Sequence, residues 1–146
     1  MRKGWRFACV VFAATQLVSV AVGQRVVTES GAISGVSESG LNVYKGVPFA
    51  APPLGDLRWR PPEHAAPWAG TRKANVFAPA CIQVGVSMPG ENPPAISEDC
   101  LYLNIWTPAK DRHKRLPVIV WIYGGGYING SASMPLYWVT VSRTKA

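Results

Sequence analysis

The chain has 146 residues, is 48% hydrophobic and 10% aromatic, and carries a formal charge of +7. Length and composition are sufficient for one domain with its own core. Three of the cations lie within the first six residues, and a second basic cluster, at residues 110–115, contains no aromatic side chain that could stack on a base. The charge therefore does not indicate a nucleic-acid partner.

The first 23 residues have the organisation of an export signal. A basic start precedes an apolar run at residues 7–22, and small residues occupy positions 21 and 23, the two that a signal peptidase reads. This pattern predicts a signal peptide at 1–23 with cleavage before Gln24, and a mature protein of charge +4 that is secreted or periplasmic. A membrane anchor is the alternative. Sixteen residues with three polar interruptions are short for a span, so no stable membrane span is expected after cleavage.

Cleavage would also remove Cys9 and leave two cysteines, Cys81 and Cys100. One cysteine pair in an exported protein indicates a disulfide. Closing the loop between them is worth roughly 3 kcal/mol in the chain-entropy model. A metal site is not expected, because two thiols and two distant histidines have no ligand spacing.

Short β-like segments follow the leader. The apolar pattern at residues 26–28, 31–36 and 41–44 is separated by glycine and serine. These segments predict an antiparallel meander.

Residues 51–80 contain six prolines and no sustained period of two or 3.6 residues. This composition predicts irregular chain, since proline interrupts both helix and sheet hydrogen bonding. We expect packing of Trp59, Trp68 and Phe77, rather than a β-ladder, to hold it.

Two further strands are expected after a loop at residues 84–99. The segment LYLNIWTP, residues 101–108, alternates in character and is typical of an antiparallel strand with two unlike faces. The segment PVIVWIYG, residues 117–124, is continuously apolar and is typical of a strand buried on both faces. Residues 110–115 between them are expected to be a solvated connection.

Three glycines, Gly124 to Gly126, follow that apolar run at once. Such a run allows positive φ and brings peptide N–H groups close to a ligand. A phosphate loop or a dinucleotide-binding loop is not indicated, because no Gly-Lys-Ser/Thr ending and no G-x-G-x-x-G spacing occurs here. An oxyanion-binding loop and a purely structural tight turn both remain open at this point.

Three blocks together resemble the type B carboxylesterases, the group that contains the cholinesterases. They are SEDCLYLNIWTP at 97–108, YKGVPFAAPPLGDLRWRPP at 44–62 and WIYGGGY at 121–127. The resemblance runs from about Val26 to about Trp138, and the EDCLYLN block is highly specific.

The resemblance implies an α/β class chain, the incomplete amino-terminal part of an α/β-hydrolase, in which antiparallel strands lead into a mixed central sheet. It implies hydrolysis of a small-molecule carboxylic ester by a triad of Ser, Glu or Asp, and His, without a cofactor. By the same resemblance the N–H groups of Gly125 and Gly126 form the oxyanion hole. Preorganised donors of this kind are each worth about 10²–10³ in rate.

The resemblance also implies scaffold contacts. Cys81 pairs with Cys100, and Arg58 meets Glu98 in a structural ion pair. Tyr127, beside the proposed hole, could contact substrate, with core packing as the alternative.

The catalytic triad itself is not found in the sequence. Residues 85–89 fail the last position of G-x-S-x-G, and in residues 130–133 the serine is one place late. The triad residues of this fold follow the oxyanion loop, so neither His64 nor His113 is expected to be the base. We therefore expect no nucleophile, acid or base in this chain, and an inactive isolated chain. The alternative is a non-catalytic, cholinesterase-like binding module.

Residues 24–138 are thus expected to be the amino-terminal portion of a carboxylesterase domain. The likeness stops after Trp138, and residues 139–146 are interpreted as an aberrant tail. One base restored after the Trp138 codon lets the tail codons encode Gly-Asp-Arg-Leu-Ala-Asn-Lys-Gly, which resembles the family's continuation. Reading the gene across this point tests a frameshift.

Overall fold

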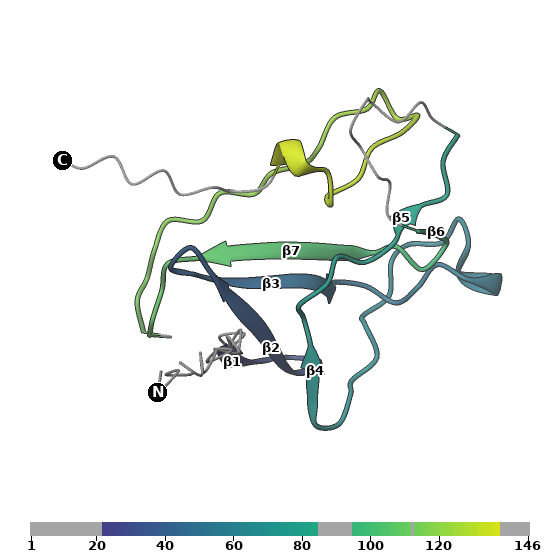
Figure 1. The fold of residues 1–146 in the computed structure, drawn as a ribbon. Coiled ribbons are helices and arrows are strands. Elements are labelled where there is room, and N and C mark those ends of the chain that lie inside the picture. The colour runs from purple at the N-terminus through teal and green to yellow at the C-terminus, as the bar shows by residue number, and fades with distance from the viewer. Residues whose placement is uncertain (1–21, 85–94, 112, 138–146) are drawn as a thin grey trace, which may run out of the picture.

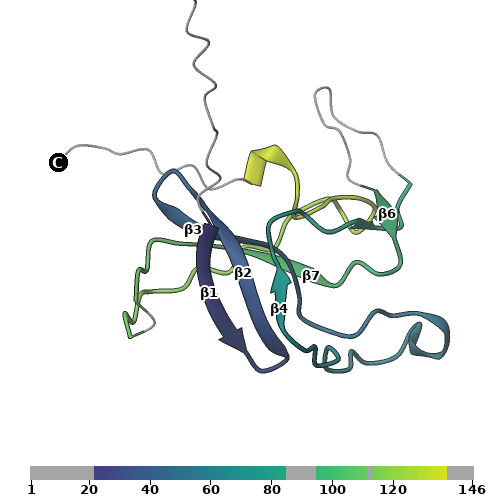
Figure 2. The same ribbon diagram turned by 60° about the horizontal axis from the view of Figure 1, so that its bottom comes forward.

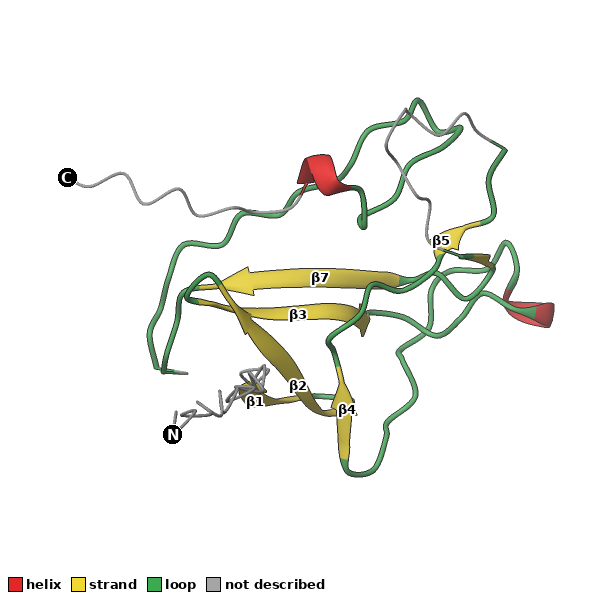
Figure 3. Cartoon of the chain, viewed as in Figure 1, coloured by secondary structure: helices red, strands yellow, loops and turns green. Residues whose placement is uncertain are grey.

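The computed structural model describes residues 22–84, 95–111 and 113–137, and these residues are mainly β-structure (Figure 1). They form a five-stranded sheet, a two-stranded sheet and two short 3-10 helices. The rest of the described chain is loop (Figure 3), and no α-helix occurs in these ranges. No helix long and apolar enough to cross a bilayer is present in them either.

The predicted meander is confirmed. Strands β1 (Val22–Thr28), β2 (Gly31–Glu38) and β3 (Leu41–Pro48) pair antiparallel in chain order. Ser39 and Gly40, with φ of 49° and 82°, make the two-residue connection between β2 and β3. Two positive φ values are the signature of a type I′ hairpin turn, whose twist matches that of the strands.

Strand β1 crosses the position of the predicted cut before Gln24, with Val22 opposite Val36. The first twenty-one residues, which contain most of the expected signal peptide, lie outside the described part of the chain.

The sheet is completed by strands from farther along the chain. Strand β7 (Tyr102–Thr107) pairs antiparallel with β3, with an irregularity between Tyr44 and Val47. Strand β4 (Thr71–Lys73) pairs parallel with β2. Figure 2 shows β1 and β4 on opposite sides of β2. The strand predicted at 101–108 is therefore confirmed as β7.

A small core lies on this sheet. Ile33, Tyr44, Val47 and Ala74 form one buried cluster, against which Trp68 packs. The indole N–H of Trp68 also donates a 2.8 Å hydrogen bond to the carbonyl of Ala32. Trp68 of the proline-rich segment thus anchors that segment to the sheet, as expected. The expectation that no β-ladder holds the segment was wrong, because β4 lies within it and pairs with β2.

The other two aromatic residues of the segment differ from each other. Phe77 packs against Trp106, with ring centroids 6.5 Å apart. Trp59 does not pack at all, so this expectation was wrong: its side chain is fully exposed. The 3-10 helix η1 (Gly55–Leu57) precedes it, and Trp59 itself has φ of 60°, so the turn directs the indole into solvent.

The expectation of a buried strand at 117–124 was also wrong. This segment forms no strand, and the side chains at 118–122 are 70–91% exposed. A strand needs a neighbour to satisfy its backbone groups and cover its side chains. None of the described residues supplies a ladder partner, and Figure 1 shows the segment outside the sheet.

Candidate functional site

The glycine loop follows the exposed apolar segment. Gly125 and Gly126 have φ of 137° and 61°. The carbonyl of Gly125 accepts hydrogen bonds from the N–H groups of Ile128 and Asn129, at 3.0 and 3.3 Å. A Cβ on residue 125 would lie 1.6 Å from the carbonyl oxygen of Asn129. The turn therefore requires glycine at position 125.

The two peptide N–H groups expected to bind an oxyanion are not engaged in the fold. Those of Gly125 and Gly126 donate no hydrogen bond to any residue that the structure describes, and both residues are exposed. A Cβ on Gly126 would meet no atom within 4 Å. This side of the loop is thus open to a ligand that accepts hydrogen bonds.

Tyr127 continues the loop in the same backbone region, with φ of 60°. Its side chain is fully exposed, so the alternative of core packing does not describe it. Positive φ is uncommon for a bulky residue and marks a constrained turn.

The loop closes on itself at Gly130. With φ of 130°, Gly130 lies so near the start of the loop that a Cβ would be 2.7 Å from both the Gly124 carbonyl and the Tyr123 ring. The side chain of Gln83 binds both backbone groups of Gly130: its Nε2 donates to the carbonyl at 2.9 Å, and its Oε1 accepts from the N–H at 2.7 Å. Sequence reasoning missed Gln83, because 47 residues separate the two partners.

A second amide holds the chain just beyond Gly130. Asn104, on β7, donates to the carbonyl of Ala132 at 3.2 Å and accepts from the N–H of Gly46 at 2.9 Å. This side chain therefore connects the loop to the central sheet. The hydroxyls of Ser131 and Ser133 share a hydrogen bond of 2.6 Å.

A disulfide lies next to these contacts. Cys81 and Cys100 are bonded, with an S–S distance of 2.01 Å. Cys81 ends β5 (Ala80–Cys81), which pairs parallel with β6 (Ile96–Ser97). The bond ties the segment carrying Gln83 to the start of β7.

A cavity of about 30 Å³ is lined by the disulfide, Asn104, Tyr123 and residues 131–133, together with neighbouring residues. This volume suits about one water molecule. It is far too small for an ester, so a ligand would have to approach the exposed side of the loop.

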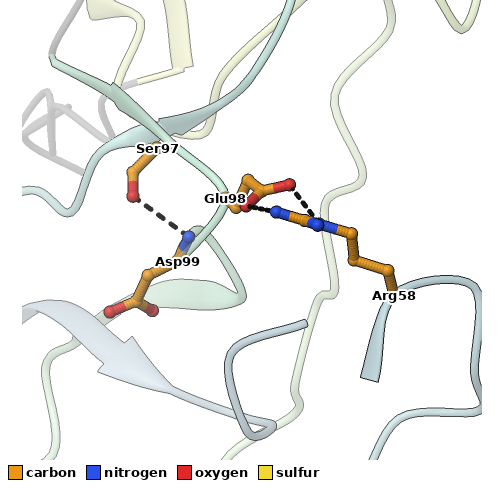
Figure 4. Close-up of polar contacts among 4 residues, drawn as sticks. All are labelled: Arg58, Ser97, Glu98 and Asp99. Carbon is orange, nitrogen blue, oxygen red and sulfur yellow. Dashed lines mark hydrogen bonds and ion pairs between the residues drawn. The ribbon is translucent and has the colours of Figure 1, made fainter. Parts of the chain in front are cut away.

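The guanidinium of Arg58 binds the carboxylate of Glu98 through two hydrogen bonds, of 2.6 and 2.5 Å (Figure 4). The hydrogen bond to Arg58 lowers the pKa of Glu98 from its ordinary value. The same pairing raises the pKa of Arg58. In Figure 4 the hydroxyl of Ser97 accepts from the Asp99 N–H at 3.1 Å, which shapes the turn that presents Glu98.

The remaining candidates lie on the surface or outside the described residues. His64 and His113 are exposed, as are Lys110 and Lys114 of the basic connection. Residues 85–89, the first near-match to a serine elbow, lie outside the description. Within the described ranges no three His, Cys, Asp or Glu side chains gather to hold a metal.

Comparison with known proteins places the chain in a family. A model of the carboxylesterase family matches residues 23–140. The chain is 51% identical over 110 residues to fumonisin B1 esterase of Sphingopyxis macrogoltabida, covering 75% of this chain and 20% of that protein. It is 44% identical over 125 residues to acetylcholinesterase of Bungarus fasciatus, covering 77% of this chain and 20% of that protein.

A solved thermophilic PNB esterase matches with a TM-score of 0.72 and 38% identity, over 78% of this chain and 24% of that structure. The chain thus spans about a fifth to a quarter of the length of these relatives. The sheet described above is the amino-terminal part of an α/β-hydrolase fold. The chain belongs to the carboxylesterase family.

Proposed function

We propose that this chain is the amino-terminal part of an exported carboxylic-ester hydrolase, in which the N–H groups of Gly125 and Gly126 bind the oxyanion. One observation carries the proposal: Gly125 and Gly126 are exposed and their N–H groups donate to none of the described residues, in a turn that requires glycine at position 125. The names of the relatives support hydrolysis of esters as the reaction class.

The chemistry follows from the position of these donors. Attack of a nucleophile on an ester carbonyl places negative charge on the carbonyl oxygen. Donors that already point at this oxygen stabilise the charge without rearranging. The nucleophile, the acid, the base and the third N–H donor belong to parts of the fold that follow the oxyanion loop. The isolated chain is therefore proposed to be inactive, and no cofactor or metal takes part.

Export is part of the proposal. Residues 1–23 act as a signal peptide that is cut before Gln24, and the protein is secreted or periplasmic. The disulfide supports an oxidising compartment. Amino-terminal sequencing of the exported protein tests the cut, and an intact Met1 would contradict it. Sequencing the gene across the Trp138 codon tests the proposed frameshift at residues 139–146.

The activity is tested in a chimera. Residues 24–138 replace the matching segment of fumonisin B1 esterase, a relative 51% identical over 110 residues, which supplies the remaining residues of the fold. The chimera should hydrolyse p-nitrophenyl butyrate, and the 146-residue chain alone should not. A folded chimera without hydrolysis would contradict the proposal and favour the non-catalytic binding module.

Two glycine substitutions then test the donors. Gly125→Ala displaces the turn, because the new Cβ overlaps the Asn129 carbonyl. It should lower kcat/KM by about 10²–10³. It should also weaken the binding of a trifluoromethyl ketone inhibitor, which forms an oxyanion on the enzyme, by a similar factor. In Gly126→Ala the new Cβ has no atom within 4 Å, and φ of 61° leaves only conformational strain. This variant should therefore lower kcat/KM by less than about tenfold. A folded Gly125→Ala chimera with full activity would exclude this loop as the oxyanion hole.

A further inference from the structure

We infer that Gln83 is a positioning residue for the glycine loop, and that it couples the loop to the Cys81–Cys100 disulfide. This inference rests on the proposed oxyanion role of Gly125 and Gly126. It concerns how the loop is held in place, because a side chain from another part of the chain binds the loop at Gly130.

The contact of Gln83 with Gly130 uses both backbone groups of that residue. An amide side chain presents a donor and an acceptor side by side at every pH, which a carboxylate cannot do. The second hydrogen of Nε2 is engaged as well, by the carbonyl of Cys81 at 3.1 Å. Each rotation of the amide therefore breaks at least one of three hydrogen bonds, so the side chain holds one orientation.

The hydrogen bonds of Gln83 act on the loop at Gly130. It lies against Tyr123 and Gly124, at the opposite end of the same loop. Residues 124–129 between these ends are all exposed. Fixing Gly130 therefore fixes the base of the turn that carries Gly125 and Gly126.

The disulfide supplies the fixed point for Gln83. Cys81 is two residues before Gln83, and its sulfur is bonded to Cys100, which lies two residues before the first residue of β7. A continuous series of contacts runs from the sheet through Cys100, Cys81 and Gln83 to Gly130. Displacements of about 1 Å in groups that position a reacting centre can cost about 10² in rate.

The test compares three variants of the chimera. Gln83→Ala should lower kcat about 10- to 100-fold and weaken binding of the trifluoromethyl ketone by the same factor. KM should change less than about twofold, because the N–H donors stabilise the oxyanion of the transition state more than the bound ester. Asn42→Ala is the matched structural control. Asn42 is a buried amide that binds the Ala109 carbonyl at 2.9 Å, away from the loop. It should lower the melting temperature and leave kcat within about twofold.

Gln83→Glu makes the test specific. A protonated carboxyl has one donor and one acceptor and reproduces both contacts with Gly130, whereas a carboxylate only accepts. The ratio of variant to parent kcat should therefore rise as the pH falls from 8 towards 5. A flat ratio, or a loss in Gln83→Ala that appears only as a lower melting temperature, would overturn the inference.

Amide hydrogen exchange separates this inference from the proposed function. Gln83→Ala should accelerate exchange of the Gly130 N–H, in the 146-residue chain and in the chimera, whether or not the chimera hydrolyses esters. If the chimera is inactive but Gly130 exchange is accelerated, the proposed function is contradicted and the positioning role of Gln83 is supported. If the chimera is active but Gln83→Ala leaves Gly130 exchange unchanged, only the positioning role of Gln83 is contradicted.

Discussion

Strand β3 and the segment at 118–122 show that apolar sequence and burial are different properties. The second segment reads VIVWI and is 70–91% exposed. Strand β3 contains Asn42 and Lys45, yet five of its eight residues are buried. β3 lies between β2 and β7, whereas residues 118–122 have no ladder neighbour among the described residues. The difference teaches that neighbours, not composition, decide whether a strand is buried.

The polar residues of β3 are tolerated because their groups are satisfied. Asn42, 6% exposed, donates to the carbonyl of Ala109, and the Lys45 ammonium lies 2.7 Å from the Glu38 carboxylate. Buried polar groups cost little once they are hydrogen-bonded.

The largest expected effect comes from matched substitutions in the two regions. Ile33, which is 2% exposed, lies in the core of the sheet, whereas Ile119 is 91% exposed. Ile33→Ala should lower the free energy of unfolding by about 2–5 kcal/mol through lost burial and a cavity. Ile119→Ala should change it by less than about 0.5 kcal/mol. Urea denaturation of the 146-residue chain measures both.

The chimera sharpens this test. There the rest of the hydrolase is expected to cover residues 118–122, so Ile119→Ala should cost about 2–5 kcal/mol as well. An Ile119 substitution that stays neutral in the chimera would show that neighbours are not what the segment lacks.

The next effect concerns the disulfide. Replacing Cys81 and Cys100 together by serine should lower the free energy of unfolding by roughly 3 kcal/mol, because the unfolded chain loses its closed loop. Dithiothreitol should destabilise the parent similarly and leave the double variant unchanged. Equal stability of the oxidised and reduced parent would contradict a stabilising role.

Glycine substitutions give a smaller contrast. A Cβ on Gly35 would lie 2.1 Å from the Val43 carbonyl, where β2 and β3 meet. Gly35→Ala should therefore cost about 1–3 kcal/mol by overpacking. A Cβ on Gly124 would meet no atom within 4 Å, so Gly124→Ala should stay within about 0.5 kcal/mol. If the two variants lowered the free energy of unfolding equally in thermal denaturation, close packing at Gly35 would not be what makes its substitution costly.

The smallest effect is the pH dependence of the Arg58–Glu98 pair. Because Arg58 lowers the pKa of Glu98, the carboxylate contributes stability above the ordinary glutamate pKa of about 4.3. That contribution is lost as the pH falls through the lowered pKa. Glu98→Gln should thus differ from the parent at neutral pH and converge with it in acid. The difference should also shrink in high salt, since the pair is exposed.

Sequence patterns predicted the meander and β7 because their signals are local. Serine and glycine at 39–40 specify the hairpin turn, and alternation marks residues 101–108. The environment of Trp59 was not predictable, because it depends on the turn that the preceding 3-10 helix makes. Gln83 gives no sequence signal either, since its partner Gly130 is brought near only by the fold.

The arrangement of the sheet also sets an order of events in time. Strands β1 to β3 are joined by short turns. The proline-rich segment and the disulfide loop, by contrast, separate the end of β3 at Pro48 from the start of β7 at Tyr102. At a synthesis rate of 5–20 residues per second, that delay is on the order of several seconds. During this interval one side of β3 waits without its partner. The late arrival of β7 makes the newborn chain most vulnerable to mispairing before residue 107 has emerged.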